Sequence, residues 1–288
     1  MKYEAIREHS REFSVRKMCI VLNLAEGAYY QWLHRKQGRQ AKKEKEKVII
    51  DKVREVFEAA KQVYGYRKMQ LAMVREGWPI SEYKVRRIMR ENGFYPVSTR
   101  KYKPARKGKS TGNYFENLVR QNFHPARLNE IWAGDITYIK TNLGWAYLAI
   151  ILDLYNKEVI GYSVSKFIDS ELVKRALSNA LVKTGGGKGT IFHSDRGIQY
   201  SSQSFQEMLA INGIQGSMSR PSCPYDNACV ESFFSTAKRE CLYRKEYATI
   251  EELKLDLFAY IELFYNRKRM HRSLGYKSPV EYRLALTA

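Results

Sequence analysis

The sequence predicts a mixed α/β domain that is preceded by small all-helical modules. From residue 129 onward, strand-like apolar runs alternate with segments of helical spacing, the order expected of a sheet flanked by helices. Before residue 97 the apolar residues recur mainly at helical spacing. The charge is also uneven, because residues 1–110 contain 28 Lys and Arg against 12 Asp and Glu, whereas the rest of the chain contains 22 against 18.

Composition limits the class of protein. The 288 residues are 44% hydrophobic, which is ordinary for a globular chain with room for one catalytic domain and one or two small modules. The net charge is +20, and its concentration in the front part indicates a polyanionic partner, most commonly a nucleic acid. The alternative is a basic surface that only keeps the protein soluble.

Location and redox state follow from two further features. No stretch approaches the roughly 18–20 uncharged apolar residues of a membrane span, and charges replace a hydrophobic signal core at the N-terminus, so we expect a cytoplasmic protein. Cys19, Cys223, Cys229 and Cys241 form no CxxC pair, which favours reduced thiols acting as small hydrophobic side chains. A zinc site that adds His193 is the alternative, without a supporting ligand spacing.

The first helical module is expected to cover residues 1–46. Apolar side chains in 14–36 have helical spacing and are interrupted at Asn23, as in a helix-turn-helix. Any helical hairpin has the same pattern, so DNA contact here is one of two alternatives. A charged connector is expected at 35–47.

The second helical module is expected to cover residues 47–97. Its last helix runs from Ser81 to Asn92, with Ser81 as the N-cap and Gly93 as the C-terminal stop. This helix either tracks DNA phosphates or is basic only for solubility. Its cations are Lys84, Arg86, Arg87 and Arg90. A basic linker, 98–123, follows and is expected to lie along DNA, because its first part contains six cations and no acid.

The α/β domain is expected to cover residues 124–245. Three apolar runs separated by turn residues predict an antiparallel meander with strands at 131–139, 145–154 and 159–164. The remaining pattern predicts helices and strands in the order helix 169–183, strand 190–193, helix 202–212, strand 214–218 and helix 226–243. A C-terminal helical segment, 246–288, completes the chain.

Three acidic residues are candidates for catalysis. Asp135 lies in the middle of a predicted strand, where a charge is unfavourable unless a metal ion or another group compensates it. Asp195 directly follows a short predicted strand, a common place for functional side chains. In the last helix of the domain, Glu231, Ser235 and Lys238 share a stripe beside the core-facing positions, so Glu231 can face a cleft.

Carboxylates from three separate elements suit Mg²⁺, which prefers hard oxygen ligands. With two ions, one activates a water or a DNA 3′-hydroxyl and the other stabilises the leaving oxygen of an in-line phosphoryl displacement. The alternative is that these three acids, chosen among the 18 of this part of the chain, are ordinary surface charges.

The surroundings of these acids resemble those of integrase-core transposases with a DDE triad. Asp195 and Glu231 have 35 residues between them, and Lys238 lies seven positions beyond the glutamate, where that family has Lys or Arg. Segments similar to the family's motifs are 64–67, 132–139, 193–200, 226–234 and 265–279. Within the family, the chain resembles the second-reading-frame product (OrfB) of insertion sequences of the IS-three group, relatives of retroviral integrases.

The resemblance implies an RNase H-like integrase core, a mixed five-stranded sheet with flanking helices, that cleaves DNA and transfers strands. Asp135, Asp195 and Glu231 would be the catalytic residues and the ligands of two Mg²⁺ ions, for which Mn²⁺ substitutes. The implied partners are double-stranded DNA, as terminal inverted repeats and target, and further copies of the chain in a dimer or larger assembly. The upstream reading-frame product, fused or separate, is a further implied partner, and the bacterial nucleoid is the implied location.

Neighbouring residues receive less specific roles. Lys238 is expected to contact a terminal DNA phosphate, with an ordinary surface lysine as the alternative. His193 is expected to satisfy a strand-end hydrogen bond rather than shape a metal site, and Asn227 to cap the Glu231 helix. For Tyr200, packing is the alternative to DNA contact. The candidate DNA contacts are Lys238, Arg196, Tyr200, Arg86, Arg87, Arg100, Lys101, Lys103 and Arg106.

Two rival functions remain open. An RNase H-like nuclease would hydrolyse DNA with the same metals and never join it to a target. A non-catalytic DNA-binding protein would retain the α/β domain as a scaffold, and replacing Asp135 would then change no activity.

Overall fold

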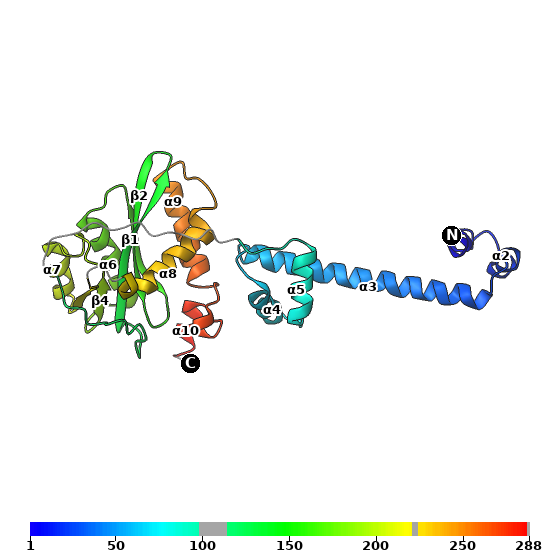
Figure 1. Ribbon diagram of the computed structural model, residues 1–288, viewed down its shortest axis with the longest axis horizontal. Coiled ribbons are helices and arrows are strands. Elements are labelled where there is room, and N and C mark those ends of the chain that lie inside the picture. Colours follow the sequence, from blue (N-terminus) through cyan, green and yellow to red (C-terminus); the bar gives the residue numbers. More distant parts are fainter. Residues whose placement is uncertain (98–113, 221–223, 287–288) are drawn as a thin grey trace. The chain divides into compact units, whose positions relative to one another are not determined.

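The computed structural model describes residues 1–97, 114–220 and 224–286, and the chain divides into two compact units, Met1–Phe94 and Tyr95–Ala288 (Figure 1). Four of the expected DNA contacts and one cysteine lie outside the described residues, namely Arg100, Lys101, Lys103, Arg106 and Cys223.

The first unit begins with three helices, α1 (Lys2–Glu8), α2 (Val15–Val21) and α3 (Glu26–Ala59). They enclose a small core whose buried members are Ile6, Cys19 and Tyr29. The two short helical segments predicted within 14–36 are confirmed as α2 and the start of α3. Asn23 lies between them with a positive φ of 52°, which asparagine tolerates better than most residues.

The charged segment 35–47 differs from the expectation, because it is helical and not a connector. It lies inside α3, which is one continuous helix of 34 residues. Lys, Arg, Glu and Gln dominate this stretch, and all four are good helix formers. Gln40 also donates a hydrogen bond of 3.0 Å to Glu44, one turn further along. Local helix propensity therefore continues the helix where no apolar stripe is present.

The second half of α3 packs with α4 (Tyr66–Arg75) and α5 (Glu82–Glu91). Their shared core includes the buried side chains Val53, Phe57, Met69, Met73, Val85 and Ile88. Ser81 caps α5, since its hydroxyl accepts a hydrogen bond from the Lys84 backbone N–H at 3.3 Å. Gly93, just past the helix, has a φ of +70°, which glycine adopts without steric cost. Both predicted ends of this helix are confirmed.

The second unit is built on a five-stranded sheet with the strand order β3-β2-β1-β4-β5. The strands are β1 (Ile131–Thr141), β2 (Gly144–Asp153), β3 (Val159–Ser165), β4 (Ile191–Ser194) and β5 (Gln215–Met218). The first three form an antiparallel meander, whereas β4 runs parallel to β1 and β5 parallel to β4. The expected mixed sheet and its meander are confirmed.

Helices flank this sheet within the second unit (Figure 1). They are α6 (Ser170–Thr184), α7 (Gln203–Ile211), α8 (Ala228–Ala237) and α9 (Ile250–Phe258). A core of buried side chains, among them Trp132, Phe192 and Leu177, joins the sheet to α6 and α7. Side chains alternate between the faces of a strand, so Asp135 lies on the face opposite Trp132. α8 packs against β1.

The C-terminal segment packs onto this sheet in the same compact unit. The shorter elements of the second unit are η1 (Pro224–Asn227), the π-helical turns η2 (Lys238–Leu242) and η3 (Ala259–Tyr265), η4 (Arg272–Leu274) and α10 (Pro279–Leu284). The Asn266 side chain bonds to both backbone groups of Val159 in β3, at 3.0 and 2.9 Å, and Arg283 donates to the buried Glu158 at 3.0 Å. Among the described helices of either unit, none has the length and apolar character needed to cross a membrane.

Candidate active site

Asp135 is a buried carboxylate in the middle of β1. Its side chain is 6% exposed, and one oxygen accepts a hydrogen bond of 2.8 Å from the Ile136 backbone N–H. The preceding Gly134 allows close packing, because a Cβ at that position would come within 2.5 Å of the Phe192 ring. The sequence therefore places a charge where the backbone is held tightly against the core, which requires compensation from nearby groups.

Asp195 directly follows β4, the strand that pairs in parallel with the β1 strand of Asp135. The register ends with Ala133 opposite His193, so Asp135 and Asp195 each come two residues after the last pair. Asp135 is still within β1, whereas Asp195 lies in the loop after β4. The Gly197 backbone N–H donates a hydrogen bond of 3.0 Å to Asp195 and orients it.

Two buried side chains, Tyr200 and Lys238, respond to the charges of these carboxylates. Burial raises the pKa of Tyr200 well above its usual range, and the charges of Asp135 and Asp195 raise that pKa further. Burial lowers the pKa of Lys238, and the Asp135 carboxylate partly opposes this shift. The lysine is 3% exposed, so the alternative of an ordinary surface lysine is wrong, and the expected phosphate contact stays a prediction.

Glu231 projects from the first turn of α8, the helix that packs against β1. It is exposed and lies one turn after Asn227 and two turns before Lys238, on the same face of the helix. Asn227 donates to the Gly134 carbonyl at 3.5 Å, and Lys238 senses Asp135. Glu231 therefore lies between Asn227, which contacts the residue before Asp135, and Lys238, whose pKa is lowered by burial and partly raised again by the Asp135 charge.

Within the described residues, no three Asp, Glu, His or Cys side chains form a group ready to hold a metal ion. The three predicted ligands come from β1, from the loop after β4 and from α8, and that they share a metal ion stays a prediction. The zinc alternative gains no support, because His193 bonds to Ser217 at 2.9 Å and to the Asp226 carbonyl at 2.8 Å. Cys241 donates to Asp256 at 3.2 Å.

His193 is fully buried, and burial lowers the pKa of its ring. Its hydrogen bonds join β4 to β5 and to η1, as expected for a strand-end histidine. Asn227 occupies the N-cap position of α8, but its side chain makes no capping bond, so that part of the expectation is wrong. Its Oδ1 atom is buried with no hydrogen-bond partner in the described part of the chain.

Asp226 lies in η1, directly before α8, and no local pattern in the sequence indicated its role there. Its side chain is 1% exposed and accepts hydrogen bonds of 2.9 Å from Asn117, Gln121 and the Arg220 backbone N–H. An acid directly before a helix N-cap is a weak signal for such a role. The asparagine and the glutamine come from residues more than 100 positions earlier, which no local pattern reveals.

The candidate DNA contacts have diverse environments. Tyr200 is 2% exposed and packs its ring against Phe192 and Phe205, which matches the packing alternative. Arg196 donates to the Ser219 carbonyl at 2.9 Å and lies over the Tyr114 ring. In the first unit, Arg87 pairs with Glu46 and Glu91, whereas Arg86 lies 5.6 Å from the centre of the Tyr66 ring.

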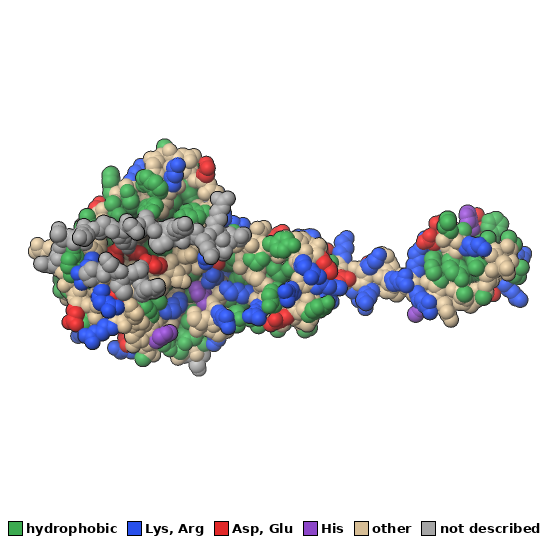
Figure 2. Space-filling model, viewed as in Figure 1, with side chains coloured by type: hydrophobic (Ala, Val, Ile, Leu, Met, Phe, Trp, Pro, Cys, Tyr) green, Lys and Arg blue, Asp and Glu red, His purple; other side chains and the backbone are tan. Residues whose placement is uncertain are grey.

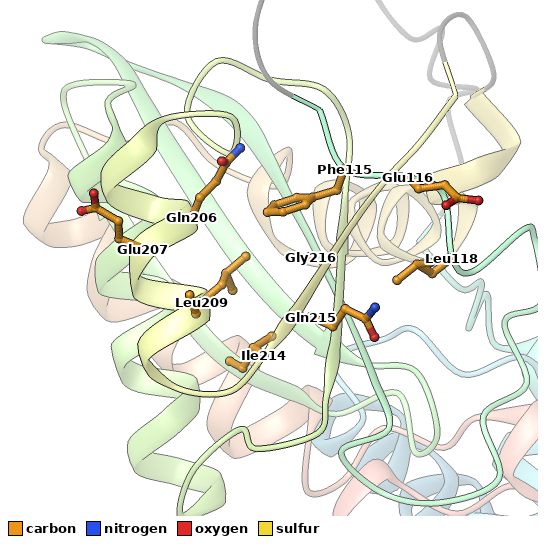
Figure 3. Close-up of a pocket in the computed structure, with 10 residues that line it drawn as sticks. Phe115, Glu116, Leu118, Gln206, Glu207, Leu209, Ile214, Gln215 and Gly216 are labelled. Atoms are coloured by element: carbon orange, nitrogen blue, oxygen red, sulfur yellow. The ribbon is translucent and has the colours of Figure 1, made fainter.

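A pocket of about 650 Å³ lies elsewhere in the second unit, between α7, β5 and residues 115–118 (Figure 3). Phe115 covers Gly216, where a Cβ would meet its ring at 2.2 Å. The lining includes Glu116 and Glu207 but none of the three candidate catalytic acids. This pocket is therefore separate from the candidate active site.

Comparisons with known proteins define the class of the fold and the site. The integrase core domain family matches residues 125–224, and a second integrase core domain family matches residues 212–279. An HTH-like domain family matches residues 43–102. The chain is a DDE-type transposase with an integrase core, a polynucleotidyl transferase by class.

Curated relatives define the family more narrowly. The transposase InsF for insertion sequence IS3A of Escherichia coli (strain K12) is 36% identical over 282 residues, covering 98% of this chain and 98% of that relative. The transposase for insertion sequence element IS904 of Lactococcus lactis subsp. lactis (strain IL1403) is 36% identical over 252 residues, covering 87% of this chain and 98% of the relative. The chain belongs to the IS3 family of transposases.

Two solved structures are also similar. One is the simian T-cell lymphotropic virus intasome in complex with PP2A regulatory subunit B56 gamma, at a TM-score of 0.46 and 20% identity, covering 74% of this chain and 69% of that chain. The other is the HTLV-2 integrase catalytic core domain in complex with magnesium, at a TM-score of 0.40 and 20% identity, covering 54% of this chain and 95% of that chain.

Proposed function

We propose that this chain cleaves DNA at the ends of an insertion sequence and joins the released strand to a target, by magnesium-dependent phosphoryl transfer. The observation that supports the proposal is the parallel pairing of β1 with β4. It brings the strand that contains Asp135 next to the strand that Asp195 follows, and the helix of Glu231 packs on β1. These three residues are the proposed catalytic residues and metal ligands. The buried Lys238 beside Asp135 adds the cation that a DNA phosphate requires.

The donor set fits magnesium chemically, because all three side chains offer hard carboxylate oxygens. Two bound Mg²⁺ ions, or Mn²⁺ in their place, would activate the attacking hydroxyl and stabilise the leaving oxygen. Backbone hydrogen bonds from Ile136 and Gly197 orient the Asp135 and Asp195 carboxylates. Glu231 is exposed on α8 and completes the set by side-chain rotation, since three close carboxylates repel one another without a cation.

Two basic residues of the site, Lys238 and Arg196, are the proposed contacts to different DNA phosphates. Lys238 is buried to 3% exposure next to Asp135, where it would hold the phosphate that undergoes attack. Arg196 lies directly after Asp195, over the Tyr114 ring, and would hold the flanking backbone. Both contacts act on phosphate, so they position DNA without reading its sequence.

We also propose that residues 1–110 bind the terminal inverted repeats, since most of the net positive charge lies there. Arg86, Arg87 and the basic segment after residue 97 are the proposed contacts. The inferred organisation is a first module at 1–46, a second at 47–97, a linker at 98–123, a core at 124–245 and a C-terminal segment at 246–288. A dimer or larger homo-oligomer would act on DNA at the bacterial nucleoid, in the cytoplasm, with the upstream reading-frame product fused or separate.

The test replaces single ligands without changing their size. Asp135→Asn and Glu231→Gln should each abolish strand joining in the presence of Mg²⁺, while binding to element-end DNA persists, because metal affinity is lost and phosphate contacts are kept. Glu207→Gln, an exposed acid on α7, is the matched control and should join DNA normally. Joining by the Asp135 variant would refute the proposed ligand set.

Strand transfer must also be separated from hydrolysis. The wild-type chain with Mg²⁺ should convert a labelled element end into a product covalently attached to target DNA. If it only cleaved the end and never produced the joined species, the chain would be a nuclease and the transferase proposal would fail.

A further inference from the structure

An exposed aromatic cluster beside the candidate active site is not used by the proposed chemistry. It consists of Tyr138, Trp145 and Tyr243, which are 43%, 53% and 63% exposed. The Tyr138 and Trp145 rings lie 5.3 Å apart, nearly perpendicular to each other. Burial raises the pKa of Tyr243, and the Tyr138 phenol raises it further. Hydrophobic side chains are visible on the surface at this end of the sheet (Figure 2).

The cluster is held in place by the chain around it. Tyr138 and Trp145 belong to the two strands of the β1–β2 hairpin, and Tyr243 directly follows η2. The hairpin turn is tied to the loop after η2, because the Asn142 backbone N–H donates to the Tyr247 carbonyl at 2.9 Å. Rings that are fixed before binding lose little conformational entropy when a flat ligand stacks on them.

The position of the cluster relates it to the reacting phosphate. Tyr138 comes three residues after Asp135 on β1, which corresponds to about 10 Å along the strand, and its side chain projects from the opposite face. The Lys238 ammonium lies 5.4 Å from the centre of the Tyr138 ring and also senses Asp135. Successive phosphates of one strand are about 3.4 Å apart along a DNA axis, so this distance along β1 corresponds to about three nucleotides of a strand that passes over Lys238.

The side chains around the aromatic cluster indicate which kind of ligand it binds. Lys140 is exposed and stands directly opposite Trp145 in the β1–β2 register, so cations lie next to the rings. Exposed aromatic rings interleaved with cations are the pattern of single-strand nucleic-acid sites, where bases stack on rings and phosphates meet the charges. A base inside a duplex already stacks on both sides, so these rings can accept only a base that has left the helix.

We propose that the Tyr138–Trp145–Tyr243 cluster binds an unstacked DNA base within about three nucleotides of the scissile phosphate. This inference rests on the proposed function and adds to it a binding site for a displaced nucleotide at the element end. The site would favour opening of the terminal base pairs and would hold the strand away from the duplex while Lys238 holds the phosphate.

The experiment compares two DNA probes with the full-length chain and without divalent metal. One probe is a fully paired duplex of the element end, and the other has its last three pairs mismatched so that these bases are already unstacked. The wild-type chain should prefer the mismatched probe. Trp145→Ala should lower that preference by about 5-fold or more, since a stacked base contributes that much to affinity, and Trp145→Phe should retain most of it.

Leu143→Ala is the matched control, because Leu143 is 74% exposed in the turn of the same hairpin but offers no ring. It should leave the preference unchanged. A 5-iododeoxyuridine in the mismatched segment should also crosslink to Trp145 on irradiation. An unchanged preference in both Trp145→Ala and Tyr243→Ala would overturn the inference. If Asp135→Asn were also inactive in strand joining, only the base-binding inference would fail and the proposed function would stand. Strand joining by Asp135→Asn would instead reject the proposed function.

Discussion

At the scale of single residues, the groups around each buried acid determine whether its carboxyl is ionised. Asp226 accepts hydrogen bonds from an arginine and two amides, and Asp135 lies near Lys238. Asp153, at the end of β2, is 1% exposed and accepts hydrogen bonds only from the backbone N–H groups of Asn129 and Tyr155, both at 2.8 Å, among the bonds described for it. Burial consequently raises its pKa to about 6.

The first prediction concerns Asp153 and pH. In the unfolded chain the pKa of this carboxyl is about 3.9. Below that pH the carboxyl is protonated in both the folded and the unfolded chain, so it does not change the free energy of unfolding. As the pH rises from about 4 to 6, only the unfolded state releases the proton, and the free energy of unfolding should fall by about 3 kcal/mol and then level off.

Asp153→Asn removes this titration, because its side chain carries no ionisable proton. Denaturant unfolding of both proteins between pH 4 and 7 therefore measures the effect as the change in their stability difference. A difference that stays constant across this range would show that the buried carboxyl has an ordinary pKa.

At the scale of elements, the helix that contains Glu231 continues into the π-helical turn η2, and the C-terminal segment secures that turn. Glu240 in η2 accepts two hydrogen bonds from the Arg269 guanidinium, at 2.7 and 2.8 Å, and one from the Tyr260 hydroxyl at 2.9 Å. The Tyr265 ring packs edge-on against Phe233 of α8, with ring centres 4.9 Å apart. The segment after residue 246 thus packs against the helix that contains Glu231 and stabilises it.

The second prediction tests this buried ion pair. Glu240→Gln leaves the Arg269 charge buried without its partner, and this should lower the free energy of unfolding by about 3–5 kcal/mol. Arg269→Lys should also destabilise, because an ammonium cannot reproduce the two parallel hydrogen bonds. Chemical denaturation monitored by circular dichroism provides the measurement.

An exposed pair serves as the control for that prediction. Glu171 on α6 accepts from Lys174 at 2.6 Å with its side chain 56% exposed, and Glu171→Gln should change stability by about 0.5 kcal/mol or less. If Glu240→Gln and Glu171→Gln changed the free energy of unfolding equally, the charge of Arg269 would be solvated by water. The ion pair with Glu240 would then not anchor η2 to the C-terminal segment.

At the scale of the whole molecule, charge and chemistry occupy different parts of the chain. Residues 1–110 contain a large excess of Lys and Arg, whereas the remainder is close to balanced. The candidate catalytic acids all lie in the second compact unit. Such a division lets one part supply most of the attraction to DNA while the other supplies the reaction.

The third prediction measures that division. Binding of the full chain to element-end DNA should weaken steeply with salt, by about a thousand-fold between 50 and 200 mM if about six phosphates are contacted. A chain beginning at residue 114 should lose most of the affinity and most of the salt dependence, as measured by fluorescence anisotropy. Its circular dichroism should confirm that the truncated chain is folded. Full affinity in the truncated chain would place the DNA-binding surface in the core.

Local patterns in the sequence were sufficient for most elements of the fold. The alternation around Asp135, the Ser81 cap and the Gly93 stop each depend on residues a few positions apart, so they could be predicted without tertiary structure. The charge division and the spacing from Asp195 to Glu231 are also properties of the chain itself. Short-range propensity and side-chain periodicity account for all of these features.

Other features depend on contacts between distant parts of the chain. The parallel pairing of β1 with β4, the burial of Tyr200 and Lys238, and the pairing of Glu240 with Arg269 arise only when the elements pack. Burial, compensation of charge and strand register are set by partners that no local window contains, because each is determined by which surfaces exclude water together. Periodicity can therefore place a carboxylate on a strand, while packing alone decides which other side chains meet it.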